Sequence, residues 1–327
     1  MRRREYGIVS GLMLTAVVLL SGCALSDTRA ETTQQTDSPV IQAGQGEQEN
    51  ANGPGTVQRA ASSEGKEEAA TEEGSSAEVT QAAQVSSGTG AKVADAPRVY
   101  MTADISPAGL RKVYEALGRT PQGRVAVKLS TGEAGNTHYL SPDLIKDLVQ
   151  SVDGTIVECN TAYGGSRAST AMHRQVAEDH GFTAIAQVDI MDENGSMSIP
   201  VTKGVNLKED FVGANLKNYD SMMVLSHFKG HAMGGFGGAI KNISIGVGSS
   251  EGKNWIHTAG ASRTSFMGGN QDRFLESMAE AAGAVIDYMG EENMLYISVM
   301  NHLSIDCDCD GNPAAPDMHD IGILASL

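Results

Sequence analysis

Residues 225–248 form a glycine-rich segment whose side chains could transfer protons or bind a metal or an anion. Glycine lacks a Cβ atom, so backbone amides in such a segment can approach a ligand closely. His227, His231 and Lys241 place two imidazoles and an amine beside these amides, and we predict that they are catalytic. The predicted cofactor-binding residues of the segment are Gly234, Gly235, Gly237, Gly238, Lys241 and Asn242. Structural histidines that bond the backbone are the alternative interpretation.

The spacing of the two histidines also allows a shared metal ion. On a helix, residues four apart lie on one face, as His227 and His231 would. No glutamate follows His227, so the metalloprotease pattern is incomplete and zincin chemistry is not expected.

Three cysteines outside the N-terminal segment could bind a soft metal. Two of them form a C-x-C turn between carboxylates, in which both sulfurs can reach one ion or cluster. A [4Fe–4S] cluster normally needs four thiolates, whereas three cysteines completed by His302, Asp306 or an external ligand suit zinc or iron. The predicted metal ligands, for an iron–sulfur cluster or a divalent iron or zinc ion, are Cys159, Cys307, Cys309 and Asp306. A disulfide from Cys159 to either other cysteine, or unreactive thiols, are the alternatives.

A second polar loop, residues 160–167, follows an apolar run. Arg167 could clamp a carboxylate or a phosphate with two hydrogen bonds, and Gly164 and Gly165 give access to the backbone. We therefore predict that Arg167 contributes to binding a small anionic ligand, with a solvated arginine as the alternative.

The hydrophobic pattern predicts an α/β fold with a mostly parallel sheet flanked by helices. Strands are expected at 124–129, 155–157, 183–188, 222–225 and 295–299, and helices from Pro107, from Pro142, over 169–180 and over 271–289. Residues 201–213 are expected to be irregular or to form a hairpin. Since ligands of open α/β sheets bind beyond the carboxyl ends of strands, the polar residues that follow three of these strands should meet in one crevice.

The N-terminal region predicts export and lipid anchoring. Residues 1–22 have the basic start and the short apolar run of a lipoprotein signal peptide, and that run is too short to span a bilayer comfortably. Cys23 would become the lipidated N-terminus, which predicts an extracytoplasmic protein whose membrane contact is the lipid; a transmembrane anchor is the alternative. Residues 23–96 are acidic and of low complexity, and predict a disordered linker.

The remaining residues, 97–327, are enough for one α/β domain. The chain has a net charge of −16 and no basic cluster beyond the signal peptide. A nucleic-acid partner is therefore not expected, because nucleic acids select a basic face.

Several motifs together resemble the bacterial and archaeal family called domain-of-unknown-function family 362, whose members are often described as uncharacterised iron–sulfur proteins. The motifs are Cys159-Asn160-Thr161-x-Tyr163-Gly164-Gly165-x-Arg167, His227-x-x-x-His231 followed by Gly237-Gly238-Ala239-Ile240-Lys241-Asn242, and Asp306-Cys307-Asp308-Cys309. The resemblance covers about residues 125–327 and implies an α/β domain that binds a metal or a cluster. Many members carry a ferredoxin-like segment that this chain lacks, and members usually continue beyond its final residues, so a truncated product is expected.

The spacing from His231 to Lys241 is also similar to that in the nickel-pincer lactate racemase family. That resemblance implies proton transfer by His231 and a cofactor anchor at Lys241. The leading hypothesis is a lipoprotein whose domain binds a metal or an iron–sulfur centre for redox chemistry or for conversion of a small acid. The alternatives are a non-catalytic lipoprotein that binds a small anion and carries a structural disulfide, and an inactive truncated family member.

Overall fold

The computed structural model describes residues 80–81 and 97–327 of the chain. The predicted signal peptide, Cys23 and nearly all of the predicted linker lie outside these residues. Among the described residues, no helix is both long enough and apolar enough to cross a bilayer.

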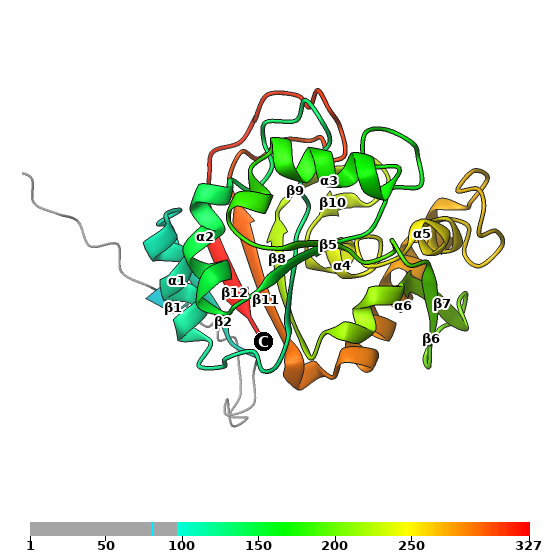
Figure 1. Cartoon of the computed structure of the whole chain (residues 1–327), viewed down its shortest axis with the longest axis horizontal. Helices are drawn as coiled ribbons and strands as arrows, with labels where there is room; N and C mark the ends of the chain where they lie inside the picture. The colour runs from blue at the N-terminus through cyan, green and yellow to red at the C-terminus, as the bar shows by residue number, and fades with distance from the viewer. Residues whose placement is uncertain (1–79, 82–96) are drawn as a thin grey trace, which may run out of the picture. The chain divides into compact units, whose positions relative to one another are not determined.

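A mixed sheet forms the centre of the domain, with the strand order β1-β2-β12-β11-β8-β3-β4-β5 (Figure 1). The strands are β1 (Thr80–Gln81), β2 (Val99–Thr102), β3 (Val125–Lys128), β4 (Thr155–Glu158), β5 (Val188–Ile190), β8 (Ser221–His227), β11 (Met294–Met300) and β12 (Gly322–Ser326). Neighbours from β11 to β5 are parallel, whereas β12 is antiparallel to β11 and to β2. The predicted α/β fold with a mostly parallel sheet is thus confirmed.

Helices cover both faces of this sheet. They are α1 (Pro107–Ala116), α2 (Pro142–Ser151), α3 (Thr170–Asp179), α4 (Ala239–Ile243), α5 (Ser250–His257) and α6 (Gln271–Met289), with short 3-10 helices η2 (Phe182–Ala184), η3 (Ala214–Asn218) and η4 (Glu291–Asn293). Local sequence explains where they begin. The Ser106 side chain accepts a hydrogen bond from Gly109 N at the start of α1, and Asn270 does the same for Arg273 N at the start of α6.

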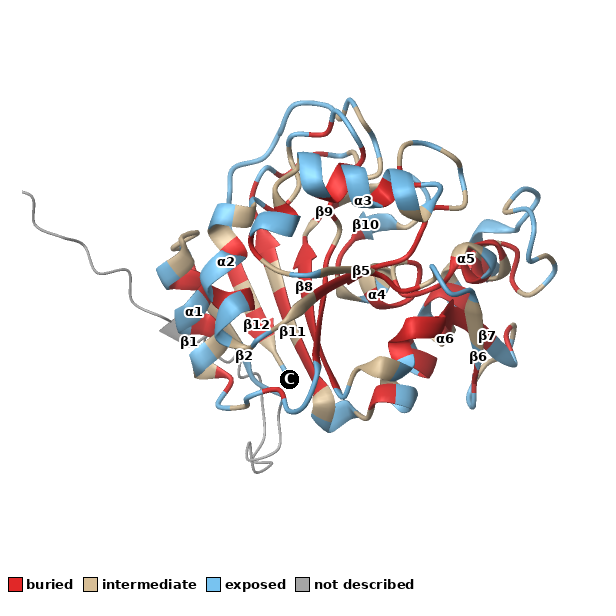
Figure 2. Cartoon of the chain, in the orientation of Figure 1, coloured by how far each residue is buried: buried red, intermediate tan, exposed pale blue. Residues whose placement is uncertain are grey.

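Two buried clusters lie on the two sides of the sheet (Figure 2). Alternation along β3 sends Val125 and Val127 to one cluster and Ala126 to the other, as expected when successive side chains of a strand point to opposite faces. Leu110 of α1 and neighbouring α2 residues cover the first face, while Val285 of α6 packs into the second. Burial on both faces explains why the central strands read as continuous apolar runs.

The structure contradicts one sequence expectation and makes a second one more precise. The strand predicted at 183–188 is wrong: Gly181 takes a left-handed φ of 85°, Phe182 begins η2, and the strand is β5, Val188–Ile190. A left-handed residue ends the preceding helix and turns the chain into the short helix before β5 can begin. The region 201–213 belongs to a hairpin of β6 (Ser196–Pro200) and β7 (Glu209–Gly213).

A buried carboxylate lies on β7. Asp210 is fully buried; its Oδ1 accepts a hydrogen bond from Phe211 N at 2.9 Å, and no hydrogen-bond partner reaches its Oδ2 among the described residues. Burial raises the pKa of Asp210 from 3.8 to about 7. A carboxyl group whose pKa is raised on folding lowers the free energy of unfolding at any pH where the group is ionised in the unfolded chain. The loss grows as the pH rises and reaches its full size above the folded pKa.

The variant Asp210→Asn should therefore gain stability over the wild type as the pH rises from 4 to 8. The shift from 3.8 to about 7 corresponds to a relative gain of at most about 4 kcal/mol in the free energy of unfolding. Urea unfolding of both proteins across this pH range measures it. Asp147→Asn, at an exposed position of α2, controls for loss of one charge; a pH-independent difference between Asp210→Asn and wild type would contradict the prediction.

Candidate functional site

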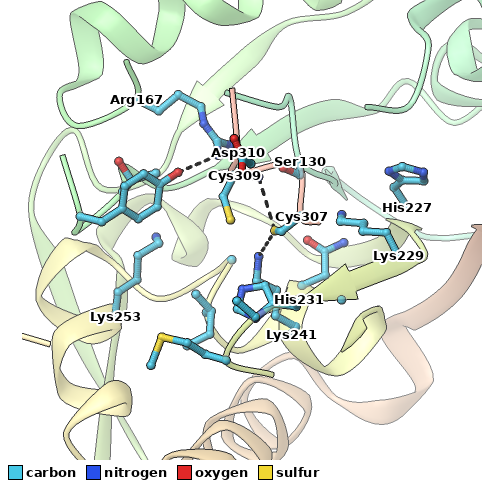
Figure 3. A pocket seen from close by; sticks show the side chains of 18 of the residues that line it. Ser130, Arg167, His227, Lys229, His231, Lys241, Lys253, Cys307, Cys309 and Asp310 are labelled. Carbon is cyan, nitrogen blue, oxygen red and sulfur yellow. Dashed lines mark hydrogen bonds between the residues drawn. The ribbon is translucent and has the colours of Figure 1, made fainter. Parts of the chain in front are cut away.

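One cavity of about 440 Å³ lies at the carboxyl ends of the parallel strands (Figure 3). Lys128, Glu158 and His227 are the last residues of β3, β4 and β8, and all three line it. The expected convergence of the loops after β4, β8 and β11 in one crevice is confirmed. The predicted site residues that line the cavity are Cys159, Arg167, His227, His231, Gly237, Gly238, Lys241, Asn242, Asp306, Cys307 and Cys309.

Three of these residues form a compact group of metal-ligand atoms. One nitrogen of His231 and the sulfurs of Cys307 and Cys309 all lie within 4.8 Å of one another. His231 ends β9 (Lys229–His231), which pairs with β10 (Gly235–Gly237), and the cysteines follow β11. The two histidines are not on a helix, so the shared helical face considered for His227 and His231 does not form.

Gly230 allows the hairpin of β9 and β10 to lie close to the loop that carries Cys307 and Cys309. Gly230 N donates a hydrogen bond to Ser304 O at 2.8 Å. A Cβ atom at Gly230 would lie 2.0 Å from Ile305 O, a distance that no side chain tolerates, so only glycine fits at this crossing. The neighbouring residues Gly234 and Gly235 shape the turn of the hairpin and are not among the cavity-lining residues: Gly234 N donates to His231 Nδ1 at 2.8 Å, and Gly235 has a φ of 77°.

Neighbouring groups lower the pKa of the Cys307 thiol. A hydrogen bond from Cys309 lowers the pKa of Cys307 well below its usual value against the opposing effect of burial, and Lys241 and His231 add to the lowering. The Nζ atom of Lys241 lies 3.5 Å from Cys307 Sγ, and Figure 3 shows the amine directed at that sulfur. The same hydrogen bond and burial raise the pKa of Cys309.

The other predicted metal ligands lie apart from this group. Cys159 Sγ donates to Val247 O at 3.2 Å, and burial raises the pKa of this thiol to about 12. Asp306 Oδ2 accepts a hydrogen bond from Ala314 N at 2.7 Å. All three cysteines of the described residues are free, so the disulfide considered from the sequence is not formed. Cys159 lines the cavity but also packs in the cluster on the α6 side of the sheet.

Arg167 is engaged by protein carboxylates rather than open to a ligand. Its guanidinium lies 3.4 Å from Glu133 Oε2 and 3.4 Å from Glu158 Oε1, and it donates to the Tyr163 hydroxyl at 3.2 Å. His173 Nε2 lies 2.8 Å from the second oxygen of Glu158. The structure thus gives Arg167 a positioning role beside the cavity. Sequence reasoning missed Glu133 and Glu158, although Glu158 ends an apolar strand and was visible there.

His227 is also fully engaged. Its Nδ1 lies 2.9 Å from Asp308 Oδ1, and its Nε2 lies 2.7 Å from the carbonyl oxygen of Asn301. Lys229 Nζ donates to the second oxygen of Asp308 at 2.6 Å. Although burial opposes it, the charges of Lys229 and His227 lower the pKa of Asp308 to about 2. These contacts hold the residue between the two cysteines in place, whereas they leave no ring nitrogen of His227 for a ligand.

Two buried lysines of the cavity were missed from the sequence. Lys128 donates to Leu129 O at 2.6 Å and to Asn242 Oδ1 at 2.9 Å, and Lys253 donates to Gly248 O at 2.6 Å. Asn242 also donates through Nδ2 to Lys128 O at 3.0 Å, so this predicted cofactor-binding residue positions Lys128. The signal for Lys128 was a single cation inside the otherwise apolar run 125–129.

Comparisons with known proteins agree with the motifs quoted from the sequence. No curated protein matches the chain. Two solved structures are similar to this chain, each with a TM-score of 0.40. The lactate racemase apoprotein from Thermoanaerobacterium thermosaccharolyticum is 13% identical, and the match covers 60% of this chain and 49% of that one. A Thermotoga maritima protein is 15% identical, and the match covers 66% of this chain and 52% of that one. The chain thus spans about half the length of each. The family model described as domain of unknown function (DUF362) matches residues 125–327, and the chain belongs to that family.

Proposed function

We propose that this protein is a lipid-anchored metalloprotein whose α/β domain holds one iron or zinc ion beside a cavity for a small acid. The observation that carries the proposal is the group formed by His231, Cys307 and Cys309, whose ligand atoms lie within 4.8 Å of one another. A neighbouring lysine amine and a thiol of lowered pKa support it, since a metal ligand must be deprotonated.

The donor set fits a single metal ion that keeps an open coordination position. Two cysteines and one histidine are the ligands of some catalytic zinc sites, in which a fourth position takes water or substrate. All three residues line the cavity, so a ligand in the cavity can approach the group. When bound, a zinc ion would supply Lewis-acid chemistry and an iron ion would also supply redox chemistry.

An iron–sulfur cluster is less well supported than a single ion. Such a cluster normally needs four cysteines, and among the described residues only two sulfurs lie in the group. Cys159 donates its thiol proton to Val247 O and has a pKa raised by burial. The cysteine spacing that suggested a cluster therefore suits a mononuclear site better.

Metal analysis of anaerobically purified full chain, after loading with Fe²⁺ or Zn²⁺, tests this proposal. We expect about one equivalent of metal in the wild type, and about a tenth or less in Cys307→Ser, Cys309→Ser and His231→Ala, because each variant removes one of only three protein ligands. Cys159→Ser is the matched control and should keep its metal.

Three outcomes would argue against the single-ion site. Unchanged metal content in Cys307→Ser and Cys309→Ser would overturn the assignment of the ligands. Three or four irons per chain with broad visible absorption, lost in Cys159→Ser, would favour a cluster that includes Cys159. A wild-type chain that takes up neither metal would remove the proposal altogether.

The anchor is the second part of the proposal, and the sequence of residues 1–23 supports it. Acyl chains on Cys23 would hold the domain at the outer side of the cytoplasmic membrane, since dual or triple acylation gives stable membrane attachment. Residues 23–96 would then separate the domain from the lipid surface.

Cys23→Ser should release the protein from membranes. In a bacterial host expressing the full chain, we expect the wild type to sediment with membranes and to incorporate labelled palmitate, while the variant incorporates none and loses at least about nine tenths of its membrane fraction. Cys159→Ser controls for the loss of a cysteine. Membrane attachment of Cys23→Ser equal to that of wild type would show that another segment anchors the chain.

A further inference from the structure

The cavity carries excess positive charge in a strongly acidic protein. Five cationic side chains line it, Lys128, Arg167, Lys229, Lys241 and Lys253, against three carboxylates, Glu158, Asp306 and Asp310. The whole chain has a net charge of −16. A concave, partly enclosed surface of the opposite sign concentrates anions from solution.

Most of these cations already have a protein partner. Arg167 is paired with Glu133 and Glu158, Lys229 is paired with Asp308, and Lys241 faces the sulfur of Cys307. Lys128 and Lys253 differ from them, because no carboxylate lies within ion-pair distance of either amine among the described residues. Both are buried, with relative exposures of 1% and 7%.

Both amines nevertheless retain capacity to bind a ligand. An ammonium group has three donors. Lys128 donates to Leu129 O and Asn242 Oδ1, and Lys253 donates to Gly248 O and Cys159 O, so each amine has one donor left. Two buried amines with no carboxylate at ion-pair distance, both lining one cavity, are candidates for a role in binding.

The backbone around Lys128 makes room for its amine. A Cβ atom at Gly246 would lie 2.7 Å from Lys128 Nζ, so the missing side chain at this position leaves the space that the amine occupies. Asn242 binds Lys128 at both its amine and its carbonyl oxygen. The amine is therefore held at the cavity wall rather than buried by chance.

We propose that Lys128 and Lys253 form the subsite that binds a small oxyanion, a carboxylate or a phosphate, beside the group of His231, Cys307 and Cys309. The proposal deepens the proposed function because it names the ligand class of the same cavity. Anion binding at the lysines does not require the metal. A chain that binds an anion but no metal would contradict only the metal proposal, and a chain that binds metal but no anion would contradict only the subsite.

Isothermal titration calorimetry of the full chain with oxalate and with inorganic phosphate tests the subsite, in metal-loaded protein and in chelator-treated protein. We expect the wild type to bind at least one of these anions in both states. Lys128→Gln and Lys253→Met should each weaken that binding about tenfold or more, since each loses a charge-assisted hydrogen bond. Tighter binding of oxalate would indicate a carboxylate ligand, and tighter binding of inorganic phosphate would indicate a phosphate ligand.

Controls separate the possible failures. Lys203→Met, at an exposed position between β6 and β7, should bind like wild type. The chelator-treated wild type should retain anion binding, even if the metal site proves absent. Binding of neither anion by the wild type, or unchanged affinity in both lysine variants, overturns the subsite. Lys253→Met decides the question if Lys128→Gln does not fold, and circular dichroism checks folding.

The pH dependence of oxalate binding gives a second readout. Burial lowers the pKa of Lys128 to about 7; the charged or titratable groups that act on it are Glu158 and Cys159 on or after β4, Lys241 on α4 and Lys253 on α5. A bound anion stabilises the protonated amine, so affinity should be highest below pH 7 and fall by up to about tenfold per pH unit above it. The slope should be shallower in Lys128→Gln, and an equal slope in both proteins would contradict a contact with this amine.

Discussion

The close crossing of two backbones near Gly230 is the constraint on which the candidate metal group depends. Gly230 N bonds Ser304 O, and a Cβ atom at Gly230 would collide with Ile305 O. Since His231 is the next residue and the cysteines follow Ile305 within four positions, this crossing sets the separation of the imidazole from the sulfurs. Glu133 N also bonds the carbonyl oxygen of Asp308 at 2.7 Å, so the loop that carries the cysteines is hydrogen-bonded to two other segments.

Some charged groups around the cavity are paired within the protein, whereas two amines are not. Two acidic groups near its wall have protein partners: Glu158 contacts Arg167 and His173, and Asp308 contacts Lys229 and His227. This pairing keeps the carboxylates ionised in a low-dielectric setting and orients the loops that carry them. Among the described residues, the amines of Lys128 and Lys253 have no carboxylate at ion-pair distance, which leaves the cavity with more cationic than anionic side chains.

Much of the fold followed from the sequence, because hydrophobic periodicity reports burial directly. Helix 271–289 was predicted with the bounds that the structure shows, and the polar residues after the strands did meet. Pairing between distant loops could not be predicted. Arg167 looked like a free anion clamp because Glu133 lies on another loop, and Cys159 looked equivalent to Cys307 and Cys309 because its contact with Val247 O depends on packing. Lys128 was passed over since a lysine at a strand end usually reaches solvent.

The position of β12 has a consequence for the order in which the domain can be completed. Strand β12 lies between β2 and β11, and it pairs Thr102 with Ile323 across more than two thirds of the chain's length. Strand β2 therefore cannot pair with the main sheet until residues 322–326 have been synthesised. A nascent chain would hold β2 and α1 without their central neighbour during translation, and long-range pairing of this kind closes slowly.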